Sequence, residues 1–256
     1  MRNGLNADLY SLQTKQLTNN YLLIHGEKRK MIEAFLKEQI NVDLTQIMQT
    51  QFKTYCDYLR EENEKYNLTA ITEPTEIYVK HFADSALGSI AIDPKSKVCD
   101  IGSGAGFPSL PLKIVRPDIT VTLVDSLQKR ISFTRTLCEK LQISAEFYHE
   151  RAEDFAKTHS ERYDVATARA VAPLPVLLEY VAQTVKIGGT VIAYKTDESE
   201  LNSASNACNI LGLALDKTHR FVLPDGSNRC LLVFKKIKRT PPKYPRNQNK
   251  PRKQPL

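Results

Sequence analysis

The stretch VCDIGSGAGFP, residues 98–108, decides the fold because it joins a short apolar run to three closely spaced glycines. An apolar strand that ends in a glycine-rich turn and opens a helix is typical of a nucleotide-binding α/β unit. The dinucleotide fingerprint has the spacing GxGxxG and binds pyrophosphate at the helix N-terminus. Here the third glycine comes one residue early, and Phe107 stands where that fingerprint requires glycine or alanine. The spacing therefore disfavours a dinucleotide-binding dehydrogenase.

An acid precedes the first glycine by two residues, which gives the pattern D-x-G-x-G-x-G. This pattern is typical of the loop that binds S-adenosylmethionine, a cofactor with no phosphate but with an ammonium, a carboxylate and a sulfonium. A carboxylate at the strand end suits the cationic part, and loop amides suit the carboxylate because glycine lets the backbone approach a ligand closely. We predict that S-adenosylmethionine contacts Asp100, Gly102, Gly104, Gly106 and Phe107.

Two further strand ends supply the rest of the predicted cofactor site. An acid ends the apolar run VTLV, 19 residues after the last loop glycine, and an acid at about this distance accepts hydrogen bonds from ribose hydroxyls. The alternative role is a helix N-cap. The next strand end, HERAED, lies at the adenine position, although an acid there also suits the first turn of a helix. The predicted contacts are Asp125, Ser126, Leu127, Ala152 and Glu153.

Short apolar runs alternate with amphipathic ones from residue 97 onward, which predicts a parallel sheet with helices on both faces. The expected strands are 97–101, 119–124, 146–149, 165–168, 190–194, 215–223 and 229–235. The last two are joined by PDGSN, which is turn chemistry, so the mostly parallel seven-stranded sheet ends in an antiparallel hairpin. This is the α/β, Rossmann-like fold of class I S-adenosylmethionine-dependent methyltransferases. It is preceded by N-terminal helices over 44–59, with Asp43 as a suitable N-cap, and over 77–90.

Four segments follow from these patterns. We predict an N-terminal extension over 1–42, an N-terminal helical cap over 43–92, a cofactor-binding core over 93–238 and a basic, proline-rich tail over 239–256. Five scattered cysteines without CxxC spacing favour buried thiols and give no metal site. No apolar run of 18 residues and no signal sequence are visible, so we expect a cytoplasmic protein with no membrane partner.

The positive charge lies almost entirely near the C-terminus. Residues 235–256 hold nine Lys or Arg and no acid, and removing those nine from the net charge of +7 leaves residues 1–234 at −2. Five prolines in this segment disfavour helix and favour extended backbone. The segment is either a solubilising tail or a flexible clamp for an anionic partner, of which nucleic acid is the most plausible.

The combination of motifs resembles the bacterial RsmG (GidB) family. The matching blocks are YNLTAI at 66–71, HFADS at 81–85, the glycine loop through residue 108, IVRP at 114–117, LVDSL at 123–127 with KR at 129–130, ARA at 168–170 and TPPKYPR at 240–246. The resemblance covers residues 44–256. Residues 1–30 lie beyond the usual family start, and Lys195-Thr196 replaces the Lys-Gly that the family commonly has.

The resemblance implies that the chain methylates N7 of one guanosine in the decoding-region loop of 16S ribosomal RNA, free or in the small ribosomal subunit. In the family, cofactor contacts fall on the positions of Gly102, Phe107, Ala152, Glu153 and Arg169. Guanine N7 has an in-plane lone pair and no proton at neutral pH, so the transfer needs no general base and we expect no catalytic dyad.

The polar candidates for the catalytic region are Asp84, Arg169 and Lys195. Their alternative roles are a helix cap or salt-bridge partner, a surface ion pair and a solvated strand end, respectively. The predicted RNA contacts are Lys195, Lys235, Lys236, Lys238, Arg239, Lys243 and Arg246. Three other functions stay open: a nicotinamide oxidoreductase, a catalytically silent RNA-binding or ribosome assembly factor, and a methyltransferase for another substrate.

Overall fold

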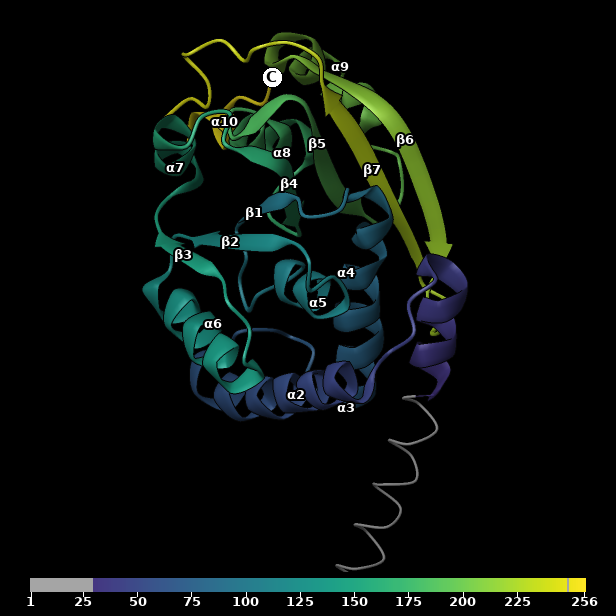
Figure 1. Ribbon diagram of the computed structural model, residues 1–256. Coiled ribbons are helices and arrows are strands. Elements are labelled where there is room, and N and C mark those ends of the chain that lie inside the picture. The colour runs from purple at the N-terminus through teal and green to yellow at the C-terminus, as the bar shows by residue number, and fades with distance from the viewer. Residues whose placement is uncertain (1–29, 248) are drawn as a thin grey trace, which may run out of the picture.

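The computed structural model describes residues 30–247 and 249–256, and there the strands form one seven-stranded sheet in the order β3-β2-β1-β4-β5-β7-β6. The strands are β1 Lys97–Ile101, β2 Thr120–Asp125, β3 Glu146–His149, β4 Tyr163–Arg169, β5 Val185–Lys195, β6 Leu213–Val222 and β7 Asn228–Lys236. All pairs from β3 to β5 are parallel, and β7 pairs antiparallel with β5 and β6. This order confirms the predicted parallel sheet closed by a hairpin (Figure 1).

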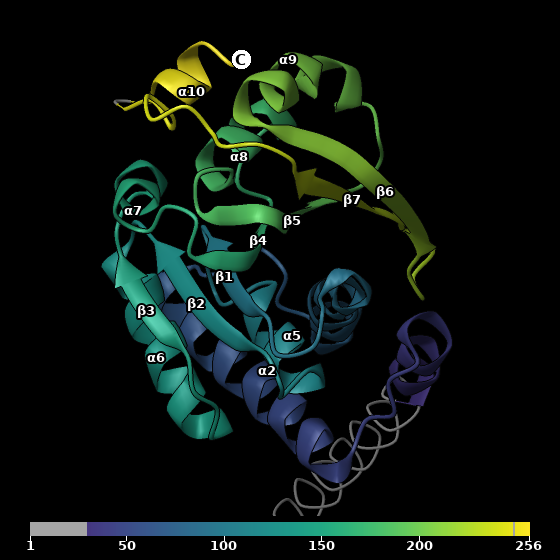
Figure 2. The same cartoon turned by 45° about the horizontal axis from the view of Figure 1, so that its top comes forward.

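Helices cover both faces of the sheet (Figures 1 and 2). Residues 30–40 are helical. The other helices are α2 Gln46–Tyr66, α3 Pro74–Glu76, η1 Ile77–Ala83, α4 Asp84–Ala86, η2 Leu87–Ala91, α5 Ser109–Val115, α6 Gln128–Leu141, α7 Ala152–Thr158, α8 Leu174–Val181, α9 Leu201–Leu211 and α10 Lys250–Lys253. The helices up to α6 pack on one face of the sheet, and α7, α8 and α9 pack on the other.

Two hydrophobic clusters fill the space between the helices and the sheet, because successive strand residues point to opposite faces. In β5, Ile192 and Tyr194 belong to the cluster beneath α2, whereas Val191 and Ala193 belong to the cluster beneath α8. The first cluster runs from Ile32 through α2 into the sheet without a break at residue 92. The helical cap therefore shares its core with the strands that form the site.

The N-terminal helices differ in detail from the sequence prediction. Thr45, not Asp43, caps α2, and its hydroxyl accepts a hydrogen bond from the amide of Met48. The single helix expected over 77–90 is divided into a π-helix, one α-turn and a 3-10 segment. π-helical turns often occur at functional sites because they redirect side chains and carbonyl groups.

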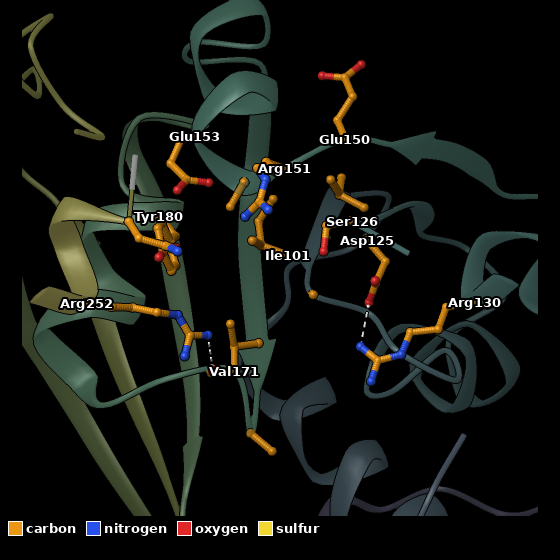
Figure 3. Close-up of a pocket in the computed structure, with 15 residues that line it drawn as sticks. Ile101, Asp125, Ser126, Arg130, Glu150, Arg151, Glu153, Val171, Tyr180 and Arg252 are labelled. Carbon is orange, nitrogen blue, oxygen red and sulfur yellow. Dashed lines mark hydrogen bonds and ion pairs between the residues drawn. The ribbon is translucent and has the colours of Figure 1, made fainter. Parts of the chain in front are cut away.

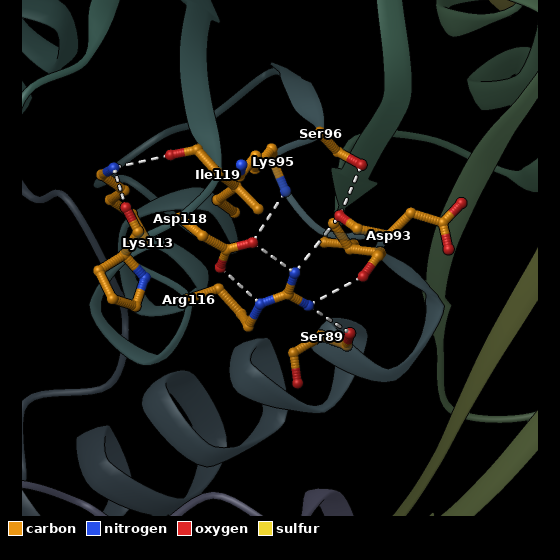
Figure 4. A network of polar contacts seen from close by, with 10 residues as sticks. Ser89, Asp93, Lys95, Ser96, Lys113, Arg116, Asp118 and Ile119 are labelled. Carbon is orange, nitrogen blue, oxygen red and sulfur yellow. Dashed lines mark hydrogen bonds and ion pairs between the residues drawn. The ribbon is translucent and has the colours of Figure 1, made fainter.

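At the amino ends of the parallel strands, the guanidinium of Arg116 connects three segments (Figure 4). It donates to both carboxylate oxygens of Asp118 at 2.8 Å and to the carbonyl oxygens of Ser89, Ile92 and Asp93. Hydrogen bonding to this guanidinium holds the pKa of Asp118 well below its usual value. This network fastens the end of η2 to the turn before β2.

Candidate active site

The glycine loop turns sharply between β1 and α5. Gly102, Gly104 and Gly106 have φ angles of +76°, +57° and +96°, in the left-handed region that glycine adopts without strain. A Cβ atom on Gly106 would lie 2.6 Å from Leu110 and 2.8 Å from the Tyr55 hydroxyl, whereas one on Gly104 would meet no atom nearer than 4.0 Å. The third glycine is thus required by packing, and the second borders open space.

Asp100 is fully buried at the end of β1. Its Oδ2 accepts hydrogen bonds from the hydroxyl of Ser109 at 2.5 Å and from the Ser109 amide at 3.3 Å. Its Oδ1 has no hydrogen-bond partner among the described residues. Burial raises the pKa of Asp100 to about 7, although the hydrogen bonds from Ser109 act in the opposite direction. A buried carboxylate oxygen without a donor is costly and suits a cationic ligand.

Asp125 holds the turn after β2 against the glycine loop. Its carboxylate accepts hydrogen bonds from the amides of Gly104 at 3.0 Å and Leu127 at 2.9 Å, and Arg130 forms an ion pair with it at 3.3 Å. Gly104 and Arg130 both contact Oδ2, and Leu127 contacts Oδ1. Each carboxylate oxygen has two lone pairs, so Oδ1 can still accept a hydrogen bond from a ligand hydroxyl. The helix-capping alternative describes part of what Asp125 does, because it receives the Leu127 amide just before α6.

A cavity of about 210 Å³ opens beside these residues, between the carboxyl ends of β1, β2 and β4 (Figure 3). It is lined by Ile101, Gly102, Val124, Asp125, Ser126, Arg130, Glu150, Arg151, Ala152, Glu153, Ala170, Val171, Tyr180, Asn249 and Arg252. The lining includes five of the predicted cofactor residues: Gly102, Asp125, Ser126, Ala152 and Glu153. It does not include Asp100, Gly104, Gly106, Phe107, Leu127 or Arg169. Clefts at the carboxyl ends of parallel strands are the usual ligand sites of such sheets.

Phe107 lies in a stack of rings between the cap and the glycine loop. Tyr55 stacks on it with centroids 5.3 Å apart and planes at 3°, and His81 stacks at 4.4 Å. The guanidinium of Arg169 lies 5.0 Å from the Phe107 ring centroid. The Tyr55 hydroxyl also donates to the carbonyl of Ala105 at 2.6 Å. The stack therefore fixes the loop to α2 and η1.

Arg169 and Asp84 form a buried ion pair next to this stack. The guanidinium of Arg169 donates to Asp84 at 2.8 Å and to the Lys80 carbonyl of the π-helix at 2.8 Å. The other carboxylate oxygen of Asp84 lies 3.4 Å from the guanidinium of Arg229, at the start of β7. Asp84 is 4% exposed, so one buried carboxylate holds two guanidinium groups at the carboxyl edge of the sheet.

His81 is neutral in this network. Burial, and then the charge of Arg169, lowers its pKa to about 3. Arg169 lies 2.9 Å from Nδ1 and always donates, so Nδ1 accepts and the ring proton is on Nε2, which donates to the Thr69 hydroxyl at 2.8 Å. Both ring nitrogens are engaged, and His81 therefore orients Arg169.

With this geometry in view, the chain can be compared with known proteins. The family model described as GidB, rRNA small subunit methyltransferase G, matches residues 48–227. The chain belongs to the GidB family. Ribosomal RNA small subunit methyltransferase G of Staphylococcus aureus strain JH9 is 45% identical over 236 residues, which cover 88% of this chain and 99% of that protein. The protein of strain Newman is 46% identical over the same length and coverage.

The GidB family assignment makes the chain an rRNA small subunit methyltransferase G and confirms the predicted methyltransferase activity on 16S ribosomal RNA. The solved structure of PH0793 from Pyrococcus horikoshii matches with a TM-score of 0.50 at 13% identity, over 60% of this chain and 62% of that chain. This likeness concerns the fold alone. Among the described residues, no helix has the length and apolar character to cross a membrane, and no three metal-ligating side chains come together.

The predicted RNA contacts of the GidB chain fall into two groups. Lys195 lies at the carboxyl edge of the sheet, where its ammonium is held by Glu200 at 2.8 Å and the Ala172 carbonyl at 3.2 Å. Lys235 lies at the opposite edge and donates to the Thr190 hydroxyl at 2.9 Å. Lys236 belongs to β7, and the other predicted basic residues lie on the tail after it. The predicted set therefore does not form one surface.

Lys236 is a correction to the predicted RNA contacts. It is 1% exposed, and its ammonium donates to the carbonyls of Ala182 and Leu211 and to the hydroxyl of Thr240. Burial lowers its pKa to about 8. An ammonium group enclosed in this way does not reach a phosphate, and we remove Lys236 from the set.

The tail is also folded, which corrects the prediction of a flexible, extended arm. Arg239 pairs with Glu161 at the surface, and Tyr244 is buried beside α8. Arg246 forms an ion pair with the fully buried Glu179 at 2.7 Å. The tail ends in the short helix α10, which lies beside α8 (Figure 2). Lys238 and Lys243 keep exposed positions on the tail surface.

Several residues of the cavity escaped sequence analysis. Tyr180 lies within a helix that is apolar apart from Glu179, and Arg252 lies in a tail whose composition indicates only an anionic partner. Outside the cavity, Arg229 follows the hairpin turn, and its neighbours in the sequence give no signal of its pairing with Asp84. Arg130 is the exception, because its position five residues after Asp125 on a helix start predicts a neighbouring pair.

Proposed function

We propose that the protein transfers the methyl group of S-adenosylmethionine to N7 of a guanosine in the decoding-region loop of 16S ribosomal RNA. The family membership supports the reaction class and the RNA. The observation that carries the cofactor is the cavity beside the glycine loop, with Asp125 on one wall and the fully buried Asp100 behind the loop.

The residues present fit S-adenosylmethionine. The unpartnered Oδ1 of Asp100 suits the ammonium group, and the open space over Gly104 leaves room for backbone contact with the amino acid part. Asp125 has acceptor capacity for ribose hydroxyls, and Ala152 and Glu153 border the adenine side. Asp100, Gly104, Gly106, Phe107 and Leu127 do not line the cavity. Gly106, Phe107 and Leu127 are proposed to act through the loop and turn that they hold, and Asp100 through the buried charge that it places behind the loop.

When bound, S-adenosylmethionine supplies a methyl group activated by a sulfonium. Guanine N7 needs no deprotonation, so this chain needs no general base. His81 agrees with that requirement because both of its ring nitrogens are engaged. The contribution of the protein is to orient the guanine, exclude water and offer fixed charges, which together can supply roughly 7–11 kcal/mol of the barrier.

Asp84 is proposed as a positioning residue for the two guanidinium groups that face the RNA. Arg169 and Arg229 both pair with it, and a planar guanidinium suits phosphate or the O6 edge of guanine. Lys195 is proposed to contact RNA from the end of β5, after exchange of its Glu200 partner for phosphate.

The test is transfer of labelled methyl groups from S-adenosylmethionine to unmodified 16S RNA and to small subunits, followed by chemical cleavage at N7-methylguanosine. One modified guanosine in the decoding-region loop is the expected result. Cofactor binding without transfer to either RNA would favour a catalytically silent RNA-binding or assembly factor. Transfer only to another substrate would favour a methyltransferase of different specificity. The test variant is Arg169→Ala, which should lose at least tenfold in transfer rate, and its thermal melting reports whether it folds.

A further inference from the structure

The C-terminal tail reaches the cofactor cavity from the far side of the sheet. Asn249 and Arg252 belong to the lining of that cavity, and Arg252 lies opposite Asp125 and Ser126 (Figure 3). The glycine loop and the strand ends form the other walls of the cavity, and the tail adds a wall from a distant part of the sequence. The term strap is used here for residues 240–247 and 249–254.

The strap is fastened to the body by two buried contacts. Tyr244 is 6% exposed within the cluster beneath α8. The carboxylate of Glu179, which is fully buried, accepts hydrogen bonds from the backbone amide and both sides of the guanidinium of Arg246 at 2.7–2.9 Å. The same guanidinium donates to the carbonyl of Gln254 at 2.8 Å. A buried, bidentate pair of this kind fixes geometry, so the position of α10 is set by the core.

Arg252 is the strap residue aimed at the cavity. Its guanidinium donates to the carbonyl of Val171 at 2.9 Å, directly after the strand that ends in Arg169 (Figure 3). It also lies beside Tyr180, where its hydrogen bond opposes the rise in the tyrosine pKa caused by burial and by Glu153. The contacts with Val171 and Tyr180 engage two of the five N–H donors of the guanidinium, and Arg252 lines the same cavity as Glu153 and Ile101.

We propose that Arg252 binds the adenosyl part of S-adenosylmethionine and that the strap is a wall of the cofactor cavity. The inference rests on the proposed function. Arg252 lies with Ala152, Glu153 and Tyr180 at the adenine side, whereas the amino acid side is bounded by Gly102 and the loop. Adenine offers ring nitrogens that accept hydrogen bonds and a face on which a guanidinium stacks. The strap thereby links the basic tail to cofactor binding.

The experiment measures dissociation constants by calorimetry for the full chain with S-adenosylmethionine and with 5′-methylthioadenosine, which lacks the amino acid part. Arg252→Ala should weaken both by the same factor, about tenfold. Lys253→Ala is the matched control, since that residue shares α10 but does not line the cavity, and its constants should stay unchanged. Arg246→Gln should weaken both ligands while the thermal melting of each variant reports that it folds.

The outcomes separate the two proposals. If the wild-type chain does not bind S-adenosylmethionine, the proposed function fails before the strap is in question. If the wild type binds and Arg252→Ala binds equally well, the role of Arg252 is overturned. If Arg252→Ala weakens S-adenosylmethionine but leaves 5′-methylthioadenosine unchanged, the guanidinium serves the amino acid end and the adenosyl assignment is wrong.

Discussion

At the amino ends of the strands, the guanidinium of Arg116 donates to a carboxylate and three carbonyls, whereas at the carboxyl ends Asp100 keeps one buried oxygen without a donor. The pKa of Asp118 is held low by its partner, and the pKa of Asp100 is raised by burial to about 7. The two edges belong to one sheet and share its core. The Arg116 cluster pairs its polar groups within the protein, whereas Asp100 leaves one buried oxygen unpaired among the described residues.

The largest loss of stability is expected at the carboxyl edge of the sheet, where the buried carboxylate of Asp84 pairs with two guanidinium groups. Asp84→Asn leaves the guanidinium groups of Arg169 and Arg229 without a counter-charge and should lower the free energy of unfolding by about 3–5 kcal/mol. Urea denaturation measures it. Asp225→Asn, at the nearby hairpin tip with a longer ion pair of 3.9 Å to Lys80, is the control and should change stability by less than about 1 kcal/mol. Equal losses in both variants would contradict the assignment.

The amino edge should respond in stability alone. Arg116→Ala removes five hydrogen bonds, to Asp118 and to carbonyl groups that are partly screened by water, and should cost about 2 kcal/mol. The dissociation constant for S-adenosylmethionine, measured on the folded fraction, should not change. A change in cofactor affinity would show that the two edges are coupled and that the comparison is too simple.

Asp100→Asn should have opposite effects on stability and binding. The folded-state pKa of Asp100 is above the unfolded value, so its contribution is fully present below pH 4 and is lost as pH rises toward about 7. Removing the charge should raise the free energy of unfolding at pH 8 by no more than about 4 kcal/mol, and the gain should vanish near pH 4. Thermal melts of the wild type and the variant at pH 8 and pH 4 measure this difference in stability.

The same substitution should weaken S-adenosylmethionine binding about tenfold at pH 8, because a carboxylate opposite an ammonium is replaced by an amide. In the wild type, affinity should fall as pH drops below about 7, where Asp100 takes up a proton. The variant should show no such dependence. A flat profile in the wild type would place the ammonium elsewhere.

The smallest effects concern the basic tail. Lys243→Ala should reduce the slope of log affinity for RNA against log salt by about 0.7, as expected for one lost phosphate contact on a single strand. Lys236→Met should leave that slope unchanged, because its ammonium is enclosed by carbonyls. Filter binding at four salt concentrations measures the slope for each variant. A reduced slope for Lys236→Met would mean that the tail rearranges on RNA.

The sequence predicted the sheet and the glycine loop because both depend on local patterns. Strand periodicity, turn chemistry and glycine spacing are set by neighbours in the chain. The Asp84–Arg169 pair, 85 residues apart, has no local signature. The burial of Lys236 did have a local signature, because Lys236 continues the alternation of the buried residues Cys230, Leu232 and Phe234 on one face of β7. The positive charge of the segment led instead to the prediction of an RNA contact.

The π-helix at residues 77–83 and the folded tail show a second limit of prediction from sequence. An amphipathic pattern predicts a helix but not the change to π geometry that turns the Lys80 carbonyl toward Arg169. Proline content predicts extended backbone, yet the buried Glu179 offers a partner that organises the tail around Arg246. Tertiary contacts override propensity in both segments.

The ring stack of Tyr55 on Phe107 has a consequence for exchange of parts between related enzymes. Because α2 supplies both the stacked ring and the hydroxyl that holds the Ala105 carbonyl, a chimera that keeps the glycine loop and replaces the cap loses both contacts that hold this loop. The helices before β1 and the loop after it therefore form one packed unit. Grafting experiments should transfer them together.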